Sequence, residues 1–221
     1  MNLSETIANM RAALVDMDGT ILDTMPEWRA CNTDYIEARG ITLSPEQRLQ
    51  VVSCSTGSLL FEYVRDELGL EIDIPTFRTL QRDRMLEAYR KVPAVKPGAR
   101  EFLAEMRRRG VKVVLATATW STHTLVALNG TGLLPFFDAI CCGEVMDCSK
   151  SRVEYYDRVA ALIGVPKDRC VLFDDAIYAL RGASTAGILG SVAVTDPTNE
   201  IFRDEFPSLA VATVTRLDEV L

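Results

Sequence analysis

Two carboxylates separated by one residue, Asp16 and Asp18, stand in the string Asp16-Met17-Asp18-Gly19-Thr20. Side chains alternate along a strand, but a glycine turn directly after the pair can aim both carboxylates at one small ligand. Such a pair can bind a metal ion, or one carboxylate can attack an electrophile while the other transfers a proton. The string therefore indicates a catalytic or metal-binding turn, and several uses remain open at this point.

Three other places in the chain put polar groups at the end of an apolar run or before a helix. Thr117 follows one apolar run, Asp174 and Asp175 follow another, and Lys150 lies shortly before a helical pattern. Taken singly, Thr117 is more often a helix cap and Lys150 a solvated surface group. Their meaning therefore depends on where the fold places them.

The elements that must position these residues alternate between strand and helix. Short apolar runs predict buried parallel strands at residues 12–15, 111–116, 139–142, 170–173 and 191–194. Helical patterns lie between them, for example at 99–109 and 152–163, each followed by a glycine. The alternation predicts an α/β fold, a doubly wound parallel sheet in which ligands bind beyond the carboxyl ends of the strands.

A segment without a comparable strand interrupts this alternation between about residues 24 and 92. It contains helical patterns at 27–39, 45–52, 58–68 and 75–90. The proline-containing joints at 23–26 and 92–98 suit a hinge or a domain boundary. We therefore expect a catalytic core of residues 1–23 and 93–221 and a small α-helical cap domain of residues 24–92.

The full string from Asp16 to Thr20 and the three later motifs, in this order, resemble the haloacid dehalogenase superfamily of phosphatases and phosphomutases. The resemblance implies a Rossmann-like core and an aspartyl-phosphate intermediate. Asp16 would attack phosphorus, and Asp18 would protonate the leaving group and later activate water. The catalytic set would be completed by Thr117 and Lys150. The phosphate-binding residues implied in the same way are Gly19, Thr20, Thr117, Ala118 and Lys150.

The resemblance also implies a magnesium ion as cofactor. Asp16, the main-chain carbonyl of Asp18 and Asp175 would bind Mg²⁺ together with the phosphate, and Asp174 would bind it directly or through water. Magnesium prefers oxygen ligands and keeps several waters, so this donor set is chemically sensible. Asp175 is the preferred direct ligand because its spacing to the following Ala-Gly pair matches the family.

Two positions depart from the family's pattern. Ser151 stands where a proline usually follows the lysine, which removes a constraint on that loop, and Ala176 stands where a serine is usual. A non-catalytic metal-binding or regulatory protein on this scaffold would be expected to have a broken catalytic set. Here the nucleophile, the acid/base, the threonine, the lysine and the metal-binding aspartate are all present. An active enzyme is therefore the preferred hypothesis.

A cap inserted directly after the first motif looks like the subgroup of phosphoglycolate phosphatases, β-phosphoglucomutases, phosphonoacetaldehyde hydrolase and haloacid dehalogenases. A dehalogenase needs no metal and typically lacks the second aspartate, so Asp18 and Asp175 argue against it. The phosphonate hydrolase needs a Schiff-base lysine, and no lysine occurs between residues 24 and 90. We expect a magnesium-dependent phosphatase of a small phosphorylated metabolite, with a β-phosphoglucomutase-like sugar phosphomutase as the alternative.

Composition and charge limit the partners. The 221 residues are 48% hydrophobic and 25% charged, as in ordinary globular proteins, and the formal net charge of −7 gives no general attraction to nucleic acid or anionic membranes. No signal-peptide pattern or apolar span is apparent, and the six cysteines lack ligand-like spacing. We expect a cytoplasmic protein with free thiols; the oligomeric state does not follow from the sequence.

Overall fold

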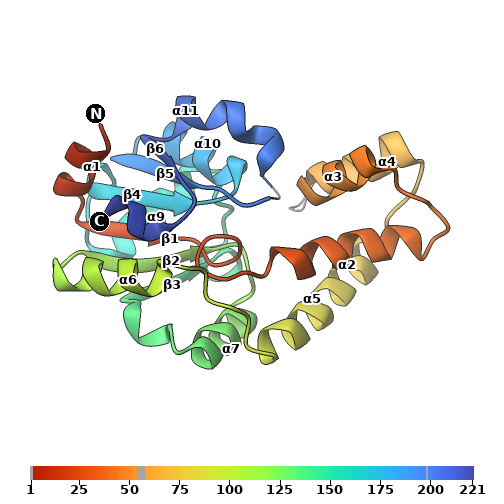
Figure 1. Cartoon of the computed structure of the whole chain (residues 1–221), viewed down its shortest axis with the longest axis horizontal. Coiled ribbons are helices and arrows are strands. Elements are labelled where there is room, and N and C mark those ends of the chain that lie inside the picture. Colours follow the sequence, from red (N-terminus) through yellow and green to blue (C-terminus); the bar gives the residue numbers. More distant parts are fainter. Residues whose placement is uncertain (1, 54–57, 198) are drawn as a thin grey trace.

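The computed structural model describes residues 2–53, 58–197 and 199–221, and these residues form one parallel sheet flanked by helices (Figure 1). The strand order is β3-β2-β1-β4-β5-β6, and each neighbouring pair runs parallel. The strands are β1 (Ala12–Val15), β2 (Lys112–Thr117), β3 (Ala139–Cys142), β4 (Cys170–Asp174), β5 (Gly190–Val194) and β6 (Ala212–Val214). The predicted α/β fold is therefore confirmed, and β6 is an edge strand too short to be predicted from its sequence.

The long helices beside the sheet cover both of its faces. They are α6 (Ala99–Arg108), α7 (Ser121–Thr131), α9 (Val153–Ile163) and α10 (Ile177–Ala186). Ala13 and Val15 point into a hydrophobic cluster that includes residues of α6 and α7, whereas Ala12 and Leu14 point into a second cluster that includes residues of α9 and α10. The doubly wound arrangement leaves the edge at the carboxyl ends of the strands as the place where polar groups can gather.

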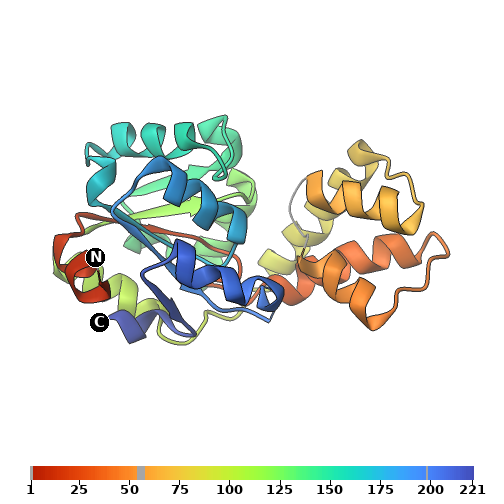
Figure 2. The ribbon, with the colours of Figure 1, turned by 90° about the horizontal axis from the view of Figure 1, so that it is seen from above.

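The segment between β1 and β2 contributes four further helices and a hydrophobic cluster of its own. They are α2 (Met25–Glu37), α3 (Pro45–Ser53), α4 (Ser58–Leu68) and α5 (Ile74–Arg90). Tyr35 and Phe77 pack edge to face in this cluster, with ring centroids 4.6 Å apart. Figures 1 and 2 show these helices beyond the carboxyl ends of the strands, with α5 packed against α7.

The two connections between this helical segment and the sheet run side by side. The amide of Asp23 donates to the carbonyl of Ala94 at 2.9 Å, and the amide of Lys96 donates to the carbonyl of Ile21 at 2.9 Å. Leu22 and Val95 form an antiparallel bridge between them. The chain therefore leaves and re-enters the sheet region through one paired strip, directly beside the turn at Asp16 to Thr20.

The remaining elements are short. They are α1 (Leu3–Asn9), α8 (Gly143–Met146), α11 (Phe206–Leu209) and the 3-10 turns η1 (Leu134–Phe136), η2 (Lys167–Arg169), η3 (Glu200–Glu205) and η4 (Leu217–Val220). Among the described residues, no helix combines the length and apolar character required to cross a membrane. The described cysteines are free thiols, as predicted, while Cys54 lies outside the described residues.

Candidate active site

The candidate site lies where the strand order reverses. β1 has β2 on one side and β4 on the other, so the chain crosses over in opposite directions from this central strand. Asp16 follows β1, Thr117 ends β2 and Asp174 ends β4. The amide of Asp16 also donates to the carbonyl of Phe173 at 2.9 Å, which extends the pairing of β1 and β4 to the nucleophile candidate.

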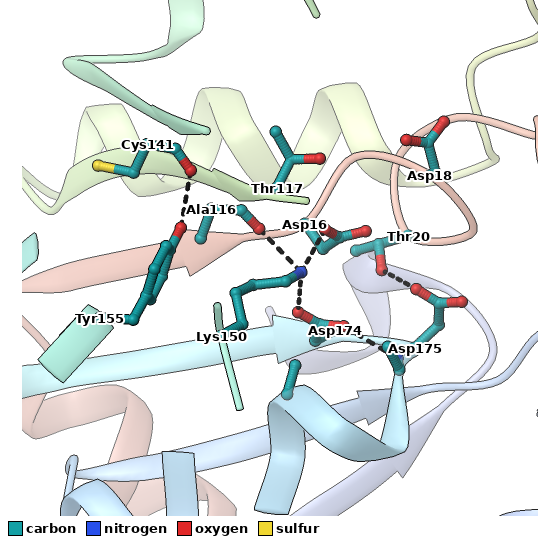
Figure 3. Close-up of polar contacts among 12 residues, drawn as sticks. Asp16, Asp18, Thr20, Ala116, Thr117, Cys141, Lys150, Tyr155, Asp174 and Asp175 are labelled. Atoms are coloured by element: carbon teal, nitrogen blue, oxygen red, sulfur yellow. Dashed lines mark hydrogen bonds and ion pairs between the residues drawn. The ribbon is translucent and has the colours of Figure 1, made fainter. Parts of the chain in front are cut away.

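Lys150 connects the ends of these strands through a single buried ammonium group. Its Nζ donates to Asp16 Oδ1 at 2.5 Å, to Asp174 Oδ2 at 2.7 Å and to the carbonyl of Ala116 at 3.0 Å (Figure 3). The lysine side chain is only 2% exposed. All three donor positions of the ammonium are therefore used, and Lys150 cannot serve as a solvated surface group.

Positive charge is scarce around these carboxylates. Burial raises the pKa of Asp16 to about 8, against the opposing effect of the Lys150 ammonium. Burial and the neighbouring carboxylates also raise the pKa of Asp175 well above its ordinary value. Burial alone would lower the pKa of Lys150, but Asp16 and Asp174 outweigh it and raise that pKa well above the usual range. Among the described residues, one ammonium thus faces three buried carboxylates, so negative charge exceeds positive charge in this cluster.

This donor set fits a divalent cation. Carboxylate oxygens of Asp16, Asp174 and Asp175 all lie within 4.8 Å of one another. Both oxygens of Asp174 have partners, since Oδ1 accepts from the amide of Ala176 at 2.9 Å and Oδ2 accepts from Lys150. Asp175 Oδ1 accepts a 3.2 Å hydrogen bond from the Thr20 hydroxyl. Hard oxygen donors with uncompensated negative charge are what Mg²⁺ requires.

Two glycines allow these groups to approach one another. Gly19 has φ +80°, and a Cβ there would lie 2.4 Å from Asp175 Oδ2. Both the backbone conformation and the close approach of the carboxylate therefore require glycine at this position. In α10, a Cβ on Gly182 would lie 2.1 Å from the carbonyl oxygen of Lys150. The Tyr156 hydroxyl lies 2.9 Å from the same oxygen. The loop without proline at Ser151 is therefore held by packing against α9 and α10.

Asp18 has different surroundings from Asp16. Its Oδ1 accepts hydrogen bonds from the hydroxyls of Thr24 at 2.5 Å and Tyr89 at 2.6 Å, and its Oδ2 accepts one from Thr119 at 2.6 Å. Burial and the nearby Asp18 carboxylate raise the pKa of Tyr89 well above its ordinary value, so the phenol keeps its proton. Figure 3 shows the Asp18 side chain pointing away from the Lys150 ammonium.

The remaining predicted residues lie at the same edge of the sheet. The Thr117 hydroxyl is buried and accepts a hydrogen bond from the amide of Thr119 at 3.1 Å, which shapes the turn after β2. Ala118 is exposed in this turn. The structure therefore brings the predicted residues of all four motifs together, although their catalytic roles remain predictions.

Several residues beside the site lie outside the four sequence motifs. Lys96 Nζ donates to the carbonyl of Gly19 and lies 3.4 Å from Asp196, which also pairs with Arg29 at 3.1 Å. Asn199 donates to the carbonyl of Asp175 at 2.9 Å. Sequence reasoning missed Lys96, Asp196, Asn199 and the Tyr89 contact. For Lys96 the available signal was its place in the joint beside the first turn; for Tyr89 there was none.

The chain is similar to known proteins along most of its length. The family model described as hydrolase, haloacid dehalogenase-like hydrolase, matches residues 10–187. Hexitol phosphatase B of Escherichia coli (strain K12) is 26% identical over 202 residues, covering 84% of each chain. A phosphorylated carbohydrates phosphatase of Thermotoga maritima is 23% identical over 191 residues, covering 86% of this chain and 88% of that protein. The crystal structure of CbbY from Rhodobacter sphaeroides in complex with phosphate has a TM-score of 0.77 at 22% identity and covers 96% of both chains.

Proposed function

The chain belongs to the family of haloacid dehalogenase-like hydrolases, and on this premise we propose that it is a magnesium-dependent phosphatase that hydrolyses a small phosphorylated metabolite through an aspartyl-phosphate on Asp16. The observation that carries the proposal is the 2.5 Å contact between Asp16 and the buried ammonium of Lys150, beside two further buried carboxylates. A nucleophilic carboxylate needs positive charge nearby before it can approach an anionic phosphate.

In the first step, an oxygen of Asp16 forms a bond to phosphorus while the bond from phosphorus to the ester oxygen breaks. Asp18 gives its proton to the departing oxygen, so an alcohol leaves rather than an alkoxide. The Lys150 ammonium, 2.5 Å from Asp16, stabilises negative charge on the nucleophile and the phosphoryl oxygens. Thr117, Gly19, Thr20 and Ala118 are proposed to bind the phosphoryl group around the turns after β1 and β2.

In the second step, a water molecule attacks the phosphorus of the aspartyl-phosphate. Asp18 takes the proton from this water as the new bond forms, and the bond between phosphorus and Asp16 breaks. Inorganic phosphate leaves, and both aspartates return to their starting states. Asp16, Asp175 and the main-chain carbonyl of Asp18, with Asp174 directly or through water, would hold a magnesium ion, which would supply positive charge to the phosphoryl oxygens.

We further propose that residues 24–92 act as a cap domain on a core of residues 1–23 and 93–221. Supporting this division, α2 to α5 have their own hydrophobic cluster, and the two connections to the sheet run side by side. Such an arrangement suits a lid that excludes water during phosphoryl transfer. Identical positions of these helices in crystals with and without a phosphate analogue would argue against a moving lid.

The substrate class is proposed from the relatives. The names of hexitol phosphatase B and the phosphorylated carbohydrates phosphatase refer to phosphorylated hexitols and carbohydrates. Each of these proteins matches more than four fifths of this chain. A phosphorylated polyol or sugar is therefore the first class to assay.

The test is a panel of phosphorylated metabolites assayed with and without magnesium, and with and without glucose bisphosphate. We expect magnesium-dependent release of inorganic phosphate from at least one alkyl phosphate. Isomerisation of a sugar phosphate that depends on added glucose bisphosphate would instead favour the phosphomutase. Absence of turnover across the whole panel, with magnesium present, would contradict an active phosphatase.

A further inference from the structure

Three hydroxyl groups from distant parts of the chain converge on the Asp18 carboxylate. Thr24 begins the helical segment, Tyr89 lies near its end in α5, and Thr119 follows β2. Thr24 is the N-cap residue of α2, yet its side chain makes no capping hydrogen bond and donates to Asp18 instead. Because a threonine in this position normally caps its helix, its diversion indicates that the carboxylate is held for another purpose.

The distribution of these donors distinguishes the two oxygens of Asp18. A carboxylate oxygen has two lone pairs, and Oδ1 accepts from both Thr24 and Tyr89. Within the part of the chain that the structure describes, Oδ2 accepts from Thr119 alone, so one of its lone pairs stays available. A hydroxyl can also accept a hydrogen bond, so Thr119 can serve Oδ2 whether that oxygen is bare or carries a proton.

We propose that Tyr89 is a positioning residue for proton transfer: together with Thr24 it occupies Oδ1 and leaves Oδ2 as the oxygen that exchanges the proton. This inference rests on the proposed function, in which Asp18 is the acid and base. Oδ2 gives its proton to the ester oxygen as the bond from phosphorus to that oxygen breaks, and it later takes one from the attacking water. In this role Tyr89 acts through the Asp18 carboxylate, to which its hydroxyl donates.

Tyr89 is suited to this task because it cannot easily move. Its side chain is fully buried, and its ring lies edge to face against His123 of α7 at 6.0 Å between centroids. His123 Nε2 in turn lies 2.7 Å from the carbonyl of Arg82 in α5. The phenol is thus fixed between α5 and α7, which makes its hydroxyl a rigid donor 2.6 Å from Oδ1.

The decisive variant is Tyr89→Phe, which keeps the ring and removes the hydroxyl. It is assayed on the best alkyl phosphate of the panel and on p-nitrophenyl phosphate, and kcat/KM is compared because it reports steps up to release of the first alcohol. An alkoxide needs a proton in order to leave, whereas p-nitrophenolate does not. We expect kcat/KM to fall roughly 10-fold on the alkyl phosphate and about 2-fold or less on p-nitrophenyl phosphate.

The matched control is Tyr35→Phe in the same helical segment. The Tyr35 hydroxyl is also buried but has no hydrogen-bond partner within the described residues, so its removal is expected to leave both kcat/KM values unchanged. In an Asp18→Asn background, Tyr89→Phe should cause no further loss on the alkyl phosphate, because the carboxylate it positions is gone. If Tyr89→Phe does not fold, Thr24→Val replaces it in the test, because this variant removes the other donor to Oδ1. It is expected to lose more activity on the alkyl phosphate than on p-nitrophenyl phosphate.

The possible outcomes distinguish failure of the positioning role of Tyr89 from failure of the proposed phosphatase function. An equal fall on both substrates, or a full additional loss in the Asp18→Asn background, would assign Tyr89 a merely structural role. Unchanged kcat/KM in Tyr89→Phe would refute the positioning role while leaving the phosphatase intact. Alkyl phosphate hydrolysis that does not depend on Asp18 at all would instead contradict the proposed function.

Discussion

Asp16 and Asp18 are two residues apart, yet they belong to different halves of the site. The ionic half consists of Asp16, Lys150, Asp174 and Asp175, all buried at the edge of the sheet. The hydroxyl half surrounds Asp18 with neutral groups, of which Thr24 and Tyr89 come from the two ends of the helical segment.

The difference lies in what the partners can do. An ammonium group only donates hydrogen bonds, so Lys150 favours Asp16 as a carboxylate with its charge in place. A hydroxyl can donate or accept, so the Thr119 contact suits Asp18 both with and without a proton. The ionic half thus concentrates charge around Asp16, and the hydroxyl half can exchange a proton at Asp18. These properties suit the proposed nucleophile and acid/base.

Asp16→Asn is expected to have the largest effect on turnover of any change in the ionic half. We expect turnover to fall by at least about 10,000-fold, because no other carboxylate can replace the attacking oxygen. Thermal unfolding should change little, since the amide is similar in size and Lys150 keeps its contact with Asp174. The check is phosphate release by the purified variant beside its melting curve. Retention of more than a few percent of the wild-type rate would show that Asp16 is not the nucleophile.

Lys150→Met removes the ammonium and leaves Asp16 and Asp174 without it. We expect the free energy of unfolding to drop by about 3–5 kcal/mol, as when one partner of a buried ion pair is deleted. Urea unfolding measures the effect. Lys167→Met is the control, because Lys167 is 37% exposed in its pair with Asp157 and should contribute under about 1 kcal/mol. Equal losses in the two variants would contradict a special role for the buried ammonium.

Magnesium should stabilise the protein in a pH-dependent manner. The folded-state pKa of Asp16 is raised from 3.8 to about 8, so stability of the metal-free protein should be lost as pH rises through this window. Added magnesium at about 100 times its Kd should then contribute about 2.7 kcal/mol at pH 8. The gain should shrink toward pH 5, because protons compete for the same oxygens. Melting curves with magnesium or with a chelator measure both trends, and a larger gain at pH 5 than at pH 8 would contradict binding at these carboxylates.

The smallest effect is expected from a substitution at Gly19, where the main chain approaches Asp175 closely. Gly19→Ala meets both an unfavourable φ of +80° and a carboxylate 2.4 Å from the new Cβ, whereas Gly164→Ala has a similar φ of +65° and nothing within 4 Å. We expect about 1–2 kcal/mol of destabilisation from the backbone at either position, and a further loss at Gly19 alone. Only Gly19→Ala should weaken stabilisation by magnesium. Identical behaviour of the two variants would argue against the approach seen at Gly19.

The sequence predicts the ionic half far better than the hydroxyl half. Apolar runs identify the central strands because both faces of a doubly wound sheet are buried, and each strand then delivers its next polar residue to the same edge. Lys150 is found only because it stands between two such motifs. Tyr89 and Thr24 have no comparable signal, since their contacts with Asp18 depend on how α5 packs against α7 and on how the two connections pair. The division at residues 24–92 and the individual catalytic roles remain predictions.

The most direct test of an aspartyl-phosphate on Asp16 uses the Asp18→Asn variant with p-nitrophenyl phosphate. The first step needs no acid with this leaving group, but hydrolysis of the intermediate still needs a base, so the intermediate should accumulate. We predict a burst of one p-nitrophenolate per chain and, after an acid quench, phosphate on the peptide that contains Asp16. Phosphate on another residue would contradict an aspartyl-phosphate on Asp16. So would an active wild-type protein whose Asp18→Asn variant shows neither a burst nor a labelled peptide.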